Sequence, residues 1–411
     1  MNKVKKDYIA VLGVFGLIVF FTSCQWRVRS YNTTMLALDY KNGFTSRALL
    51  GTIYHILDGI LPFDMICYPA AFVFALIMTL LFLVLILFFA HACLKRADSK
   101  LSDAIQILLL MFIAVSMSTF SGGYNFLRVD IFMLAVSMLG ALCIISKKAE
   151  FLVIPMSAIG VMFHQGYVFM YFNIILVLLV ARFIDAQNNR DKIRYGVYFA
   201  FSFLVGSVLF LYFELFSRNS GEEVYETVVA EAEALSYNGI YHTTLLAHEV
   251  LGIDLGDTEK GLRLVNRIQF PIYILVMIPF IVFFIIMFAG IFSEAKRAQA
   301  NRFKYLCILV GPLTMLPDFL LKVDYGRWVM SVVAYYFVVL LALLAMRDAP
   351  VESVMARLNV KLSARLWSYM LLAYPVFFLP YWDVDICEAM RSANRWLADV
   401  IPHLYRYVEW W

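Results

Sequence analysis

The sequence predicts an all-α integral membrane protein with about 10 to 11 transmembrane helices. Of its 411 residues, 63% are hydrophobic and 16% are charged, whereas an average soluble domain is about 25% charged. The apolar residues form long runs, and Lys and Arg cluster between alternate runs. Because basic loops mark the cytoplasmic side of a membrane, this pattern predicts an internal N-terminus and an external C-terminus.

Residues 1–217 are expected to form an N-terminal transmembrane bundle, interrupted by an external loop at 25–63. That loop mixes charged and apolar residues, which is typical of short helices lying in the membrane interface. The apolar run 151–181 is too long for one span of about 20 residues, and His164 to Tyr167 interrupt it. We predict a broken helix pair there, with its free backbone groups buried in protein or lining a cavity. The apolar segments of this half lie at about 8–23, 64–94, 104–120, 128–146, 151–181 and 195–216.

Residues 218–267 are predicted to form a small external helical insertion. The segment is acidic at its start, and its apolar residues recur at helical spacing. A C-terminal transmembrane bundle follows at 268–380, with apolar segments at about 269–292, 305–321, 328–345 and 366–380. Trp and Tyr residues among charges at 381–411 predict an external tail at the level of the lipid headgroups.

The charge distribution agrees with this topology. Lys and Arg outnumber Asp and Glu in the segments assigned to the inside, and the reverse holds outside. Joining 151–181 into one span would invert every later segment and place four basic clusters outside. The chain is therefore predicted to cross the cytoplasmic membrane many times.

The sequence lacks the motifs that are typical of nucleotide-binding proteins, zinc proteases and serine hydrolases. The chain has no P-loop, no Gly-x-Gly-x-x-Gly opening a helix, no His-Glu-x-x-His and no Gly-x-Ser-x-Gly. Its six cysteines include no Cys-x-x-Cys pair, so they are expected to be core residues. His242 and His248 are six residues apart and leave one helical face, so no metal is predicted there with Glu249. We expect no cofactor and no nucleic-acid partner.

Three predicted external loops each contain a carboxylate and an arginine. Ionisable groups at membrane depth are costly and usually face a bundle interior or a wet cavity, so the three pairs predict one shared site. The pairs are Asp39 with Arg47, Arg128 with Asp130, and Asp324 with Arg327.

The candidate groups suit chemistry on a phosphate-linked substrate. Arginine binds phosphate in a bidentate manner, which predicts phosphate contacts from Arg47, Arg128 and Arg327. A carboxylate can take a proton from an attacking hydroxyl, and Asp39 is the first candidate for this base. His164 would serve either as the base or as a hydrogen-bond donor to the phosphate, since its ordinary pKa of about 6.5 allows both forms. Residues predicted to orient these groups are Asp130, Asp324 and Gln165.

Simpler roles remain open for the same residues. Asp39 would then be a solvated loop residue and His164 a core histidine with satisfied hydrogen bonds. The other two pairs would be an interfacial ion pair at 128–130 and a helix anchor at 324–327.

Short polar motifs lie in and beside the predicted external loops: Asp39, Gly43–Arg47, Leu49–Gly51, Asn125–Asp130 and His164–Phe169. These motifs resemble those of bacterial surface-polysaccharide polymerases and of the related lipid-sugar-dependent transferases of the GT-C type. The resemblance implies a membrane-embedded glycosyltransferase with Asp39 as base and external arginines on a lipid pyrophosphate. The implied partners are a lipid-linked glycan, membrane lipids and other proteins of envelope biosynthesis. The acidic 218–267 segment departs from the arginine-rich external loop of many O-antigen polymerases.

Two other classes of function remain open. A transporter or flippase for a lipid-linked sugar or another anion could use the same arginines and broken helices. Transporters usually show inverted repeats, and no clear repeat is present here. The third class is a structural subunit of a larger assembly.

Overall fold

The structure is a computed structural model of the chain and describes residues 3–23, 26–97, 99–117, 126–216, 221–253, 274, 277–321 and 325–362. These residues form helices and connecting segments, with no strand among them. The described part of the chain is thus all-helical, in agreement with the predicted class. The predicted segment 366–380, the tail 381–411 and residues 254–267 of the insertion lie outside the described residues.

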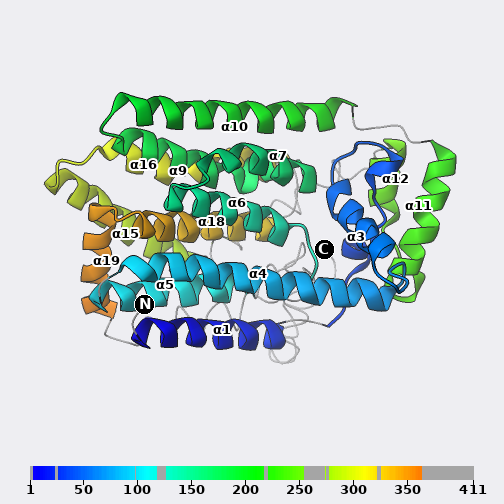
Figure 1. The fold of residues 1–411 in the computed structure, drawn as a ribbon, viewed down its shortest axis with the longest axis horizontal. Helices are drawn as coiled ribbons and strands as arrows, with labels where there is room; N and C mark the ends of the chain where they lie inside the picture. Colours follow the sequence, from blue (N-terminus) through cyan, green and yellow to red (C-terminus); the bar gives the residue numbers. More distant parts are fainter. Residues whose placement is uncertain are drawn as a thin grey trace, which may run out of the picture.

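Most helices run side by side in one bundle (Figure 1). They are α1 (Lys3–Ser23), α4 (Tyr68–Arg96), α5 (Ser99–Val115), α6 (Asp130–Ser146), α7 (Val153–Phe163), α9 (Phe172–Asp185), α10 (Asn189–Phe216), α15 (Ile278–Arg297), α16 (Arg302–Val310) and α18 (Tyr325–Ala345). At one end of the bundle α19 (Ala349–Leu362) crosses their direction and packs against α5 and α15.

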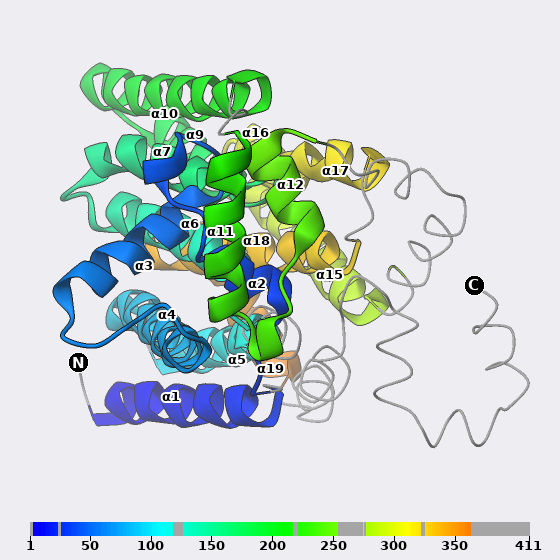
Figure 2. The same ribbon diagram turned by 90° about the vertical axis from the view of Figure 1, so that its right-hand side faces the viewer.

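Short helices form a separate unit at the other end of the bundle, which we call the cap (Figures 1 and 2). Its elements are α2 (Ser30–Thr34), η1 (Tyr40–Asn42), α3 (Ala48–Ile60), α11 (Glu222–Leu235), η5 (Tyr237–Gly239) and α12 (Thr243–Leu251). Helices α11 and α12 pack against each other and against α2. The first predicted external loop and the predicted external insertion therefore meet in the cap.

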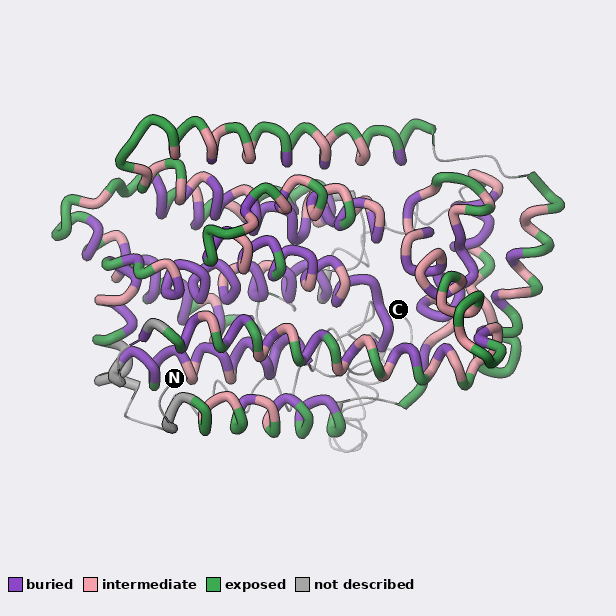
Figure 3. Tube along the Cα trace, in the orientation of Figure 1, coloured by how far each residue is buried: buried purple, intermediate pink, exposed green. Residues whose placement is uncertain are grey.

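Four described helices are long and apolar enough to cross a membrane: Tyr68–Lys95, Asn189–Phe216, Ile278–Arg297 and Arg327–Ala345. They differ in burial, since 89% of the apolar window of α18 is buried but only 17% of that of α10. Figure 3 shows the same contrast between the central α18 and the outer α10. A long apolar helix that leaves its side chains exposed is typical of contact with lipid.

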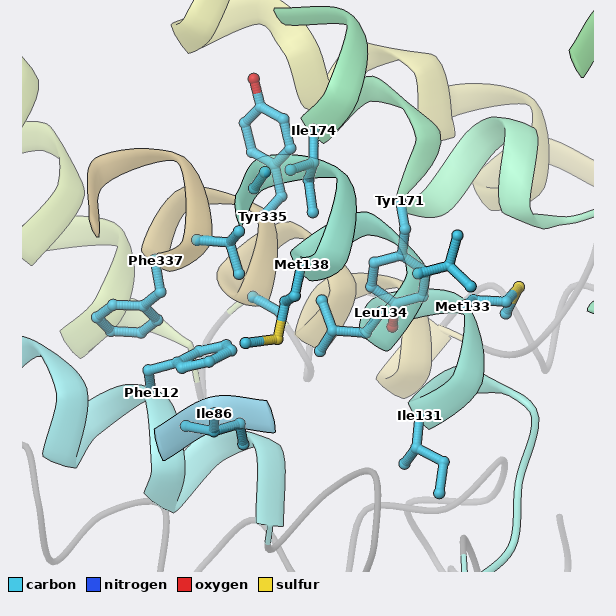
Figure 4. Packing of buried hydrophobic residues seen from close by; sticks show 14 of the residues in the cluster. Ile86, Phe112, Ile131, Met133, Leu134, Met138, Tyr171, Ile174, Tyr335 and Phe337 are labelled. Carbon is cyan, nitrogen blue, oxygen red and sulfur yellow. The ribbon is translucent and has the colours of Figure 1, made fainter. Parts of the chain in front are cut away.

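The core runs through the whole bundle. Phe112 of α5 and Phe337 of α18 approach with ring centroids 6.3 Å apart, and Ile86 and Met138 lie beside them (Figure 4). Phe337 also contacts Phe280 of α15 with its ring edge. Large interlocked side chains from four or more helices fix the distances between the helices of the bundle. These distances in turn set where α6 and α18 end next to the cap.

The long apolar run 151–181 is interrupted at His164. Helix α7 ends at Phe163, His164 is extended, and α8 (Tyr167–Met170) begins three residues later. Gly160 allows the Tyr167 ring to lie against α7, since a Cβ at Gly160 would fall 2.3 Å from that ring. The Tyr167 hydroxyl lies 3.0 Å from Ser137 Oγ of α6, which holds the break against the bundle.

A second interruption lies between α16 and α17 (Leu316–Leu321), where the 3-10 helix η6 (Gly311–Met315) begins with Gly311 and Pro312. Proline cannot donate a backbone hydrogen bond, so the helix changes direction there. A Cβ at Gly311 would lie 2.1 Å from the Tyr335 hydroxyl, which donates to the Ile308 carbonyl. The apolar segment predicted at about 305–321 is thus interrupted at these residues.

Charged groups also bind the helices together at the end opposite the cap. Lys304 Nζ of α16 lies 2.8 Å from Asp185 of α9 and 2.6 Å from Asp348, just before α19. The Tyr305 hydroxyl donates to the same Asp348 carboxylate. These contacts give a buried ammonium two counter-ions, as its desolvation requires.

Gly51 sets the position of α3 in the cap. A Cβ at Gly51 would lie 2.0 Å from the Leu38 carbonyl oxygen, which is backbone and cannot rotate away. Gly51→Ala is therefore expected to destabilise the protein by about 3 kcal/mol, measured by thermal unfolding in detergent. Gly59, in the last turn of the same helix, has nothing within 4 Å, so Gly59→Ala should be neutral or stabilise by about 0.5 kcal/mol. Equal effects of the two changes would contradict this packing.

Candidate functional site

The three predicted arginines gather where the cap meets the bundle. Arg47 is the residue preceding α3, Arg128 precedes α6, and Arg327 lies in the first turn of α18. The charge of Arg327 acts on Arg47, and the charges of Arg128 and Arg327 both act on Tyr171, so the three guanidinium groups lie near one another. We call this group, with its two carboxylates Asp130 and Glu249, the arginine cluster.

Asp130 is shared by two arginines. Its carboxylate, which is 1% exposed, accepts from Arg327 Nη2 at 2.8 Å and from Arg327 Nε at 3.2 Å. Arg128 Nε lies 3.7 Å from the same Oδ2 atom. Asp130 thus orients Arg327 across 197 residues of sequence, in addition to its near neighbour Arg128.

Arg47 meets a carboxylate that comes from the insertion. Its Nη1 lies 2.7 Å from Glu249 Oε1 of α12, and Ser46 Oγ donates to Glu249 Oε2 at 3.2 Å. Burial lowers the pKa of the Arg47 guanidinium, but Glu249, Tyr31 and Glu214 together raise it by more, so that it lies above its ordinary value. Arg47 is therefore a permanent cation.

Cations predominate among the five residues of the cluster. The guanidinium groups of its arginines meet the carboxylates of Asp130 and Glu249, and all five side chains are largely buried. The charge of Glu214 also acts on Arg47. Arginine groups screened from water attract phosphate or carboxylate more strongly than exposed ones do. The arrangement can bind an anion, and three forked donors favour one with several oxygens.

Unusual backbone conformations hold two of these arginines. Arg47 itself has a φ of 66°, and Leu127, directly before Arg128, has a φ of 71°. Residues other than glycine rarely adopt this left-handed region. Such strain persists where the surrounding structure demands it and is common in functional sites.

Tyr31 adds an aromatic surface to the cluster. The Arg128 guanidinium carbon lies 5.6 Å from the Tyr31 ring centroid, and the His242 ring approaches its edge at 5.3 Å. The next residue, Asn32, donates to the Phe126 carbonyl at 3.0 Å. This hydrogen bond ties α2 to the segment that presents Arg128, which places Tyr31 beside the cations.

Asp39 lies in a second polar group within the cap. Its carboxylate accepts from the Lys41 backbone N–H at 3.2 Å and lies 3.0 Å from Thr52 Oγ1 and 3.4 Å from His55 Nδ1. His55 Nε2 contacts Glu231 Oε1 of α11. None of the groups that act most strongly on Asp39 belongs to the arginine cluster. The contacts of Asp39 with described residues are thus with Lys41 and with Thr52 and His55 of α3, the helix that begins directly after Arg47.

Asp39 is held in its charged form. Burial raises its pKa, but the Lys41 N–H, the Thr52 hydroxyl and the charges of His55 and Lys41 lower it by more, so the pKa lies below its ordinary value. The carboxylate is consequently ionised near neutral pH, as a proton acceptor must be.

His55 makes the cap sensitive to pH. Burial lowers its pKa, but Glu231, Asp39 and the Gly51 carbonyl raise it above its ordinary value. A raised folded-state pKa means that the stabilisation is complete below the unfolded value of about 6.5 and is lost as pH rises through the folded value. The melting temperature of the parent should exceed that of His55→Gln by most in acid. The difference should shrink as the pH rises above about 6.5. A difference that is constant with pH would exclude this role.

His164 and Gln165 lie at the helix break rather than in the arginine cluster. His164 Nδ1 accepts the Gly166 backbone N–H at 2.8 Å, which stabilises the turn between α7 and α8. Buried Gln165 Oε1 has no hydrogen-bond partner among the described residues. Asp324 lies outside the described residues. No group of three or more His, Cys, Asp or Glu residues in the described part of the chain has the arrangement of a metal site.

Sequence reasoning missed the residues that pair with the predicted ones. Glu249 was considered only as a metal ligand, and His55, Glu231 and Tyr31 were not singled out. Their one signal is that His55 and Tyr31 lie in the same loop as Asp39 and Arg47. The chain matches no known family, no curated protein and no solved structure.

Proposed function

We propose that this protein is an integral membrane glycosyltransferase or polysaccharide polymerase that uses a polyprenyl-phosphate-linked or pyrophosphate-linked sugar donor on the external face of the cytoplasmic membrane. The observation that carries the proposal is the arginine cluster at the cap end of an apolar bundle. Three arginines from distant segments surround two carboxylates there. An anionic headgroup joined to a long apolar chain has the matching chemistry.

The orientation of the chain is part of the proposal. We assign the cap to the outside and the end with α19 to the inside, with about 10 to 11 crossings in all, an internal N-terminus and an external C-terminus. Four described helices that are long and apolar enough to cross a membrane support this assignment. The distribution of Lys and Arg along the sequence supports this orientation.

In the proposed reaction the arginine cluster holds the donor phosphate. An acceptor hydroxyl oxygen attacks the anomeric carbon of the sugar, a glycosidic bond forms, and the bond from that carbon to the phosphate oxygen breaks. The electron pair leaves with the polyprenyl phosphate or pyrophosphate, whose charge Arg47, Arg128 and Arg327 stabilise. Asp39 takes the hydroxyl proton; His164 is the alternative base. Other envelope biosynthesis proteins would supply the donor and remove the product.

A transporter or flippase is the second candidate. The specific observation in its favour is the helix interruption at His164, because broken helices line the substrate sites of many transporters. It would use the same arginines to bind a lipid-linked sugar or another anion without breaking a bond.

Lipid-linked intermediates in a deletion strain distinguish the two candidates. Loss of the glycosyltransferase should lead to short glycan units accumulating on the lipid outside, with the long or decorated surface glycan absent. Normal surface glycan together with lost uptake of a solute would contradict the enzyme and support the transporter.

A further inference from the structure

The Arg47 contact with Glu249 resembles an occupied ligand site. Arg47 lies directly before α3 of the cap, and its carboxylate partner comes from α12 of the insertion rather than from the bundle. The other two arginines share Asp130 on α6, which is part of the bundle itself. Glu249 is thus the carboxylate of the cluster that belongs to a different structural unit.

The contact uses only part of what the guanidinium offers. Arg47 Nη1 meets Oε1 at 2.7 Å, while Arg47 Nε is buried without a hydrogen-bond partner among the described residues. A guanidinium can bind an oxyanion through a fork of two parallel N–H groups. A phosphate, with more oxygens than a carboxylate, could engage donors that Glu249 leaves unused.

Glu249 is held in place by few polar contacts. Ser46 Oγ donates to Oε2 at 3.2 Å, and the second oxygen faces Arg47. The backbone of α12 is fixed separately, because His242 N donates to Thr34 Oγ1 at 3.1 Å and apolar residues of α12 are buried. Rotation of the Glu249 side chain would therefore expose Arg47 while the cap stays folded.

We propose that Glu249 is a built-in competitor that occupies Arg47 in the resting protein and that the phosphate of the lipid-linked donor displaces it. The inference rests on the proposed function and adds a regulatory contact to the same site. Displacement releases Glu249 from Arg47 and leaves three arginines facing Asp130 and the bound phosphate. The phosphate can therefore form a charge-assisted hydrogen bond with Arg47 only after Glu249 has moved away from Arg47.

The test measures binding of farnesyl diphosphate, a short polyprenyl diphosphate, to the purified full-length protein in detergent. Glu249→Gln keeps the shape of the side chain and removes its charge, so it should bind this probe about 10-fold more tightly than the parent. Arg47→Gln combined with Glu249→Gln should lose the gain, because the freed cation is gone.

Glu231→Gln is the matched control. It also removes a carboxylate from the insertion, but Glu231 contacts His55 and not Arg47. Its binding should stay within about 2-fold of the parent. An equal gain in both variants would mean that a loosened cap causes the effect, and would overturn the proposal.

A second variant covers the case in which Glu249→Gln fails to fold. Ser46→Ala removes the hydrogen bond that holds Glu249 but leaves Arg47 intact, so it should bind farnesyl diphosphate about 3-fold more tightly. Unchanged or weaker binding in this folded variant would overturn the proposal.

The outcomes separate the inference from the proposed function. If the parent binds farnesyl diphosphate and Glu249→Gln binds it no better, the competitor role is wrong and the proposed function stands. A gain for inorganic pyrophosphate alone would support the competitor role and contradict a lipid-linked donor. Absence of binding in the parent and in every folded variant would overturn both.

Discussion

Asp39→Asn is expected to lower turnover by about 1000-fold while leaving donor binding within about 2-fold of the parent. The change keeps the shape of the side chain and removes the charge that accepts the proton. It also preserves a carbonyl oxygen for the Lys41 N–H and Thr52 contacts, so the cap should stay folded. Turnover of a polyprenyl-pyrophosphate-linked sugar and binding of the same donor are to be measured on one preparation.

Asp58→Asn provides the control for that prediction. Asp58 lies on α3 near the same cap residues, and its carboxylate accepts the Met65 backbone N–H at 2.9 Å. Its replacement removes a negative charge from the cap without touching the proposed base, so turnover should be nearly unchanged. Normal turnover in Asp39→Asn would exclude Asp39 as the base, and would leave His164 or His55 as the group to test next.

Arg327→Met is expected to destabilise the protein by about 3 to 5 kcal/mol. The reason is that Asp130, 1% exposed, loses the forked partner that compensates its charge in the interior. Replacing Arg327 by Met together with Asp130→Asn should recover much of the loss, because no uncompensated carboxylate remains. Thermal unfolding in detergent measures both changes.

Arg357→Met serves as the reference for this effect. Arg357 Nη2 lies 2.6 Å from Glu294 Oε1, but the Arg357 side chain is 56% exposed. Water can solvate both charges of such an exposed ion pair when the partner is removed, so Arg357→Met should lose little stability. If Arg327→Met also loses little stability, the Asp130 carboxylate is not both buried and ionised, and this account of the pair is wrong.

The candidate site residues were easier to predict than the partners that hold them. Arg47, Arg128 and Arg327 stand out in sequence because charge is rare beside apolar segments and is costly at that depth. Glu249 and Glu231 lie in an acidic amphipathic segment, where a carboxylate usually faces water. Their contacts with Arg47 and His55 arise only when the insertion packs on the first loop, so no local spacing reveals them.

The positions of helices and helix breaks were likewise predictable only in part from the sequence. The interruption of 151–181 was predictable because the run exceeds one span and contains a glycine and a histidine near its middle. Helix α10, in contrast, begins at Asn189 rather than near Tyr195, since a polar first turn continues the helix beyond the apolar stretch. Asp130 was expected to orient Arg128, its neighbour in sequence, and its forked contact is with Arg327 instead.

Cleavage of a lipid-linked donor by the purified protein tests the central claim most directly. The protein is reconstituted in vesicles with a polyprenyl-pyrophosphate-linked oligosaccharide, and the released lipid pyrophosphate and the glycan length are followed. We predict release of the lipid pyrophosphate with formation of a longer or transferred glycan. Arg47→Lys, Arg128→Lys and Arg327→Lys should each lose about 30 to 150-fold in rate, because the charge remains but the fork is lost. Movement of the intact lipid-linked sugar across the vesicle membrane without bond cleavage would contradict the account. So would rates in all three lysine variants that equal the rate of the parent.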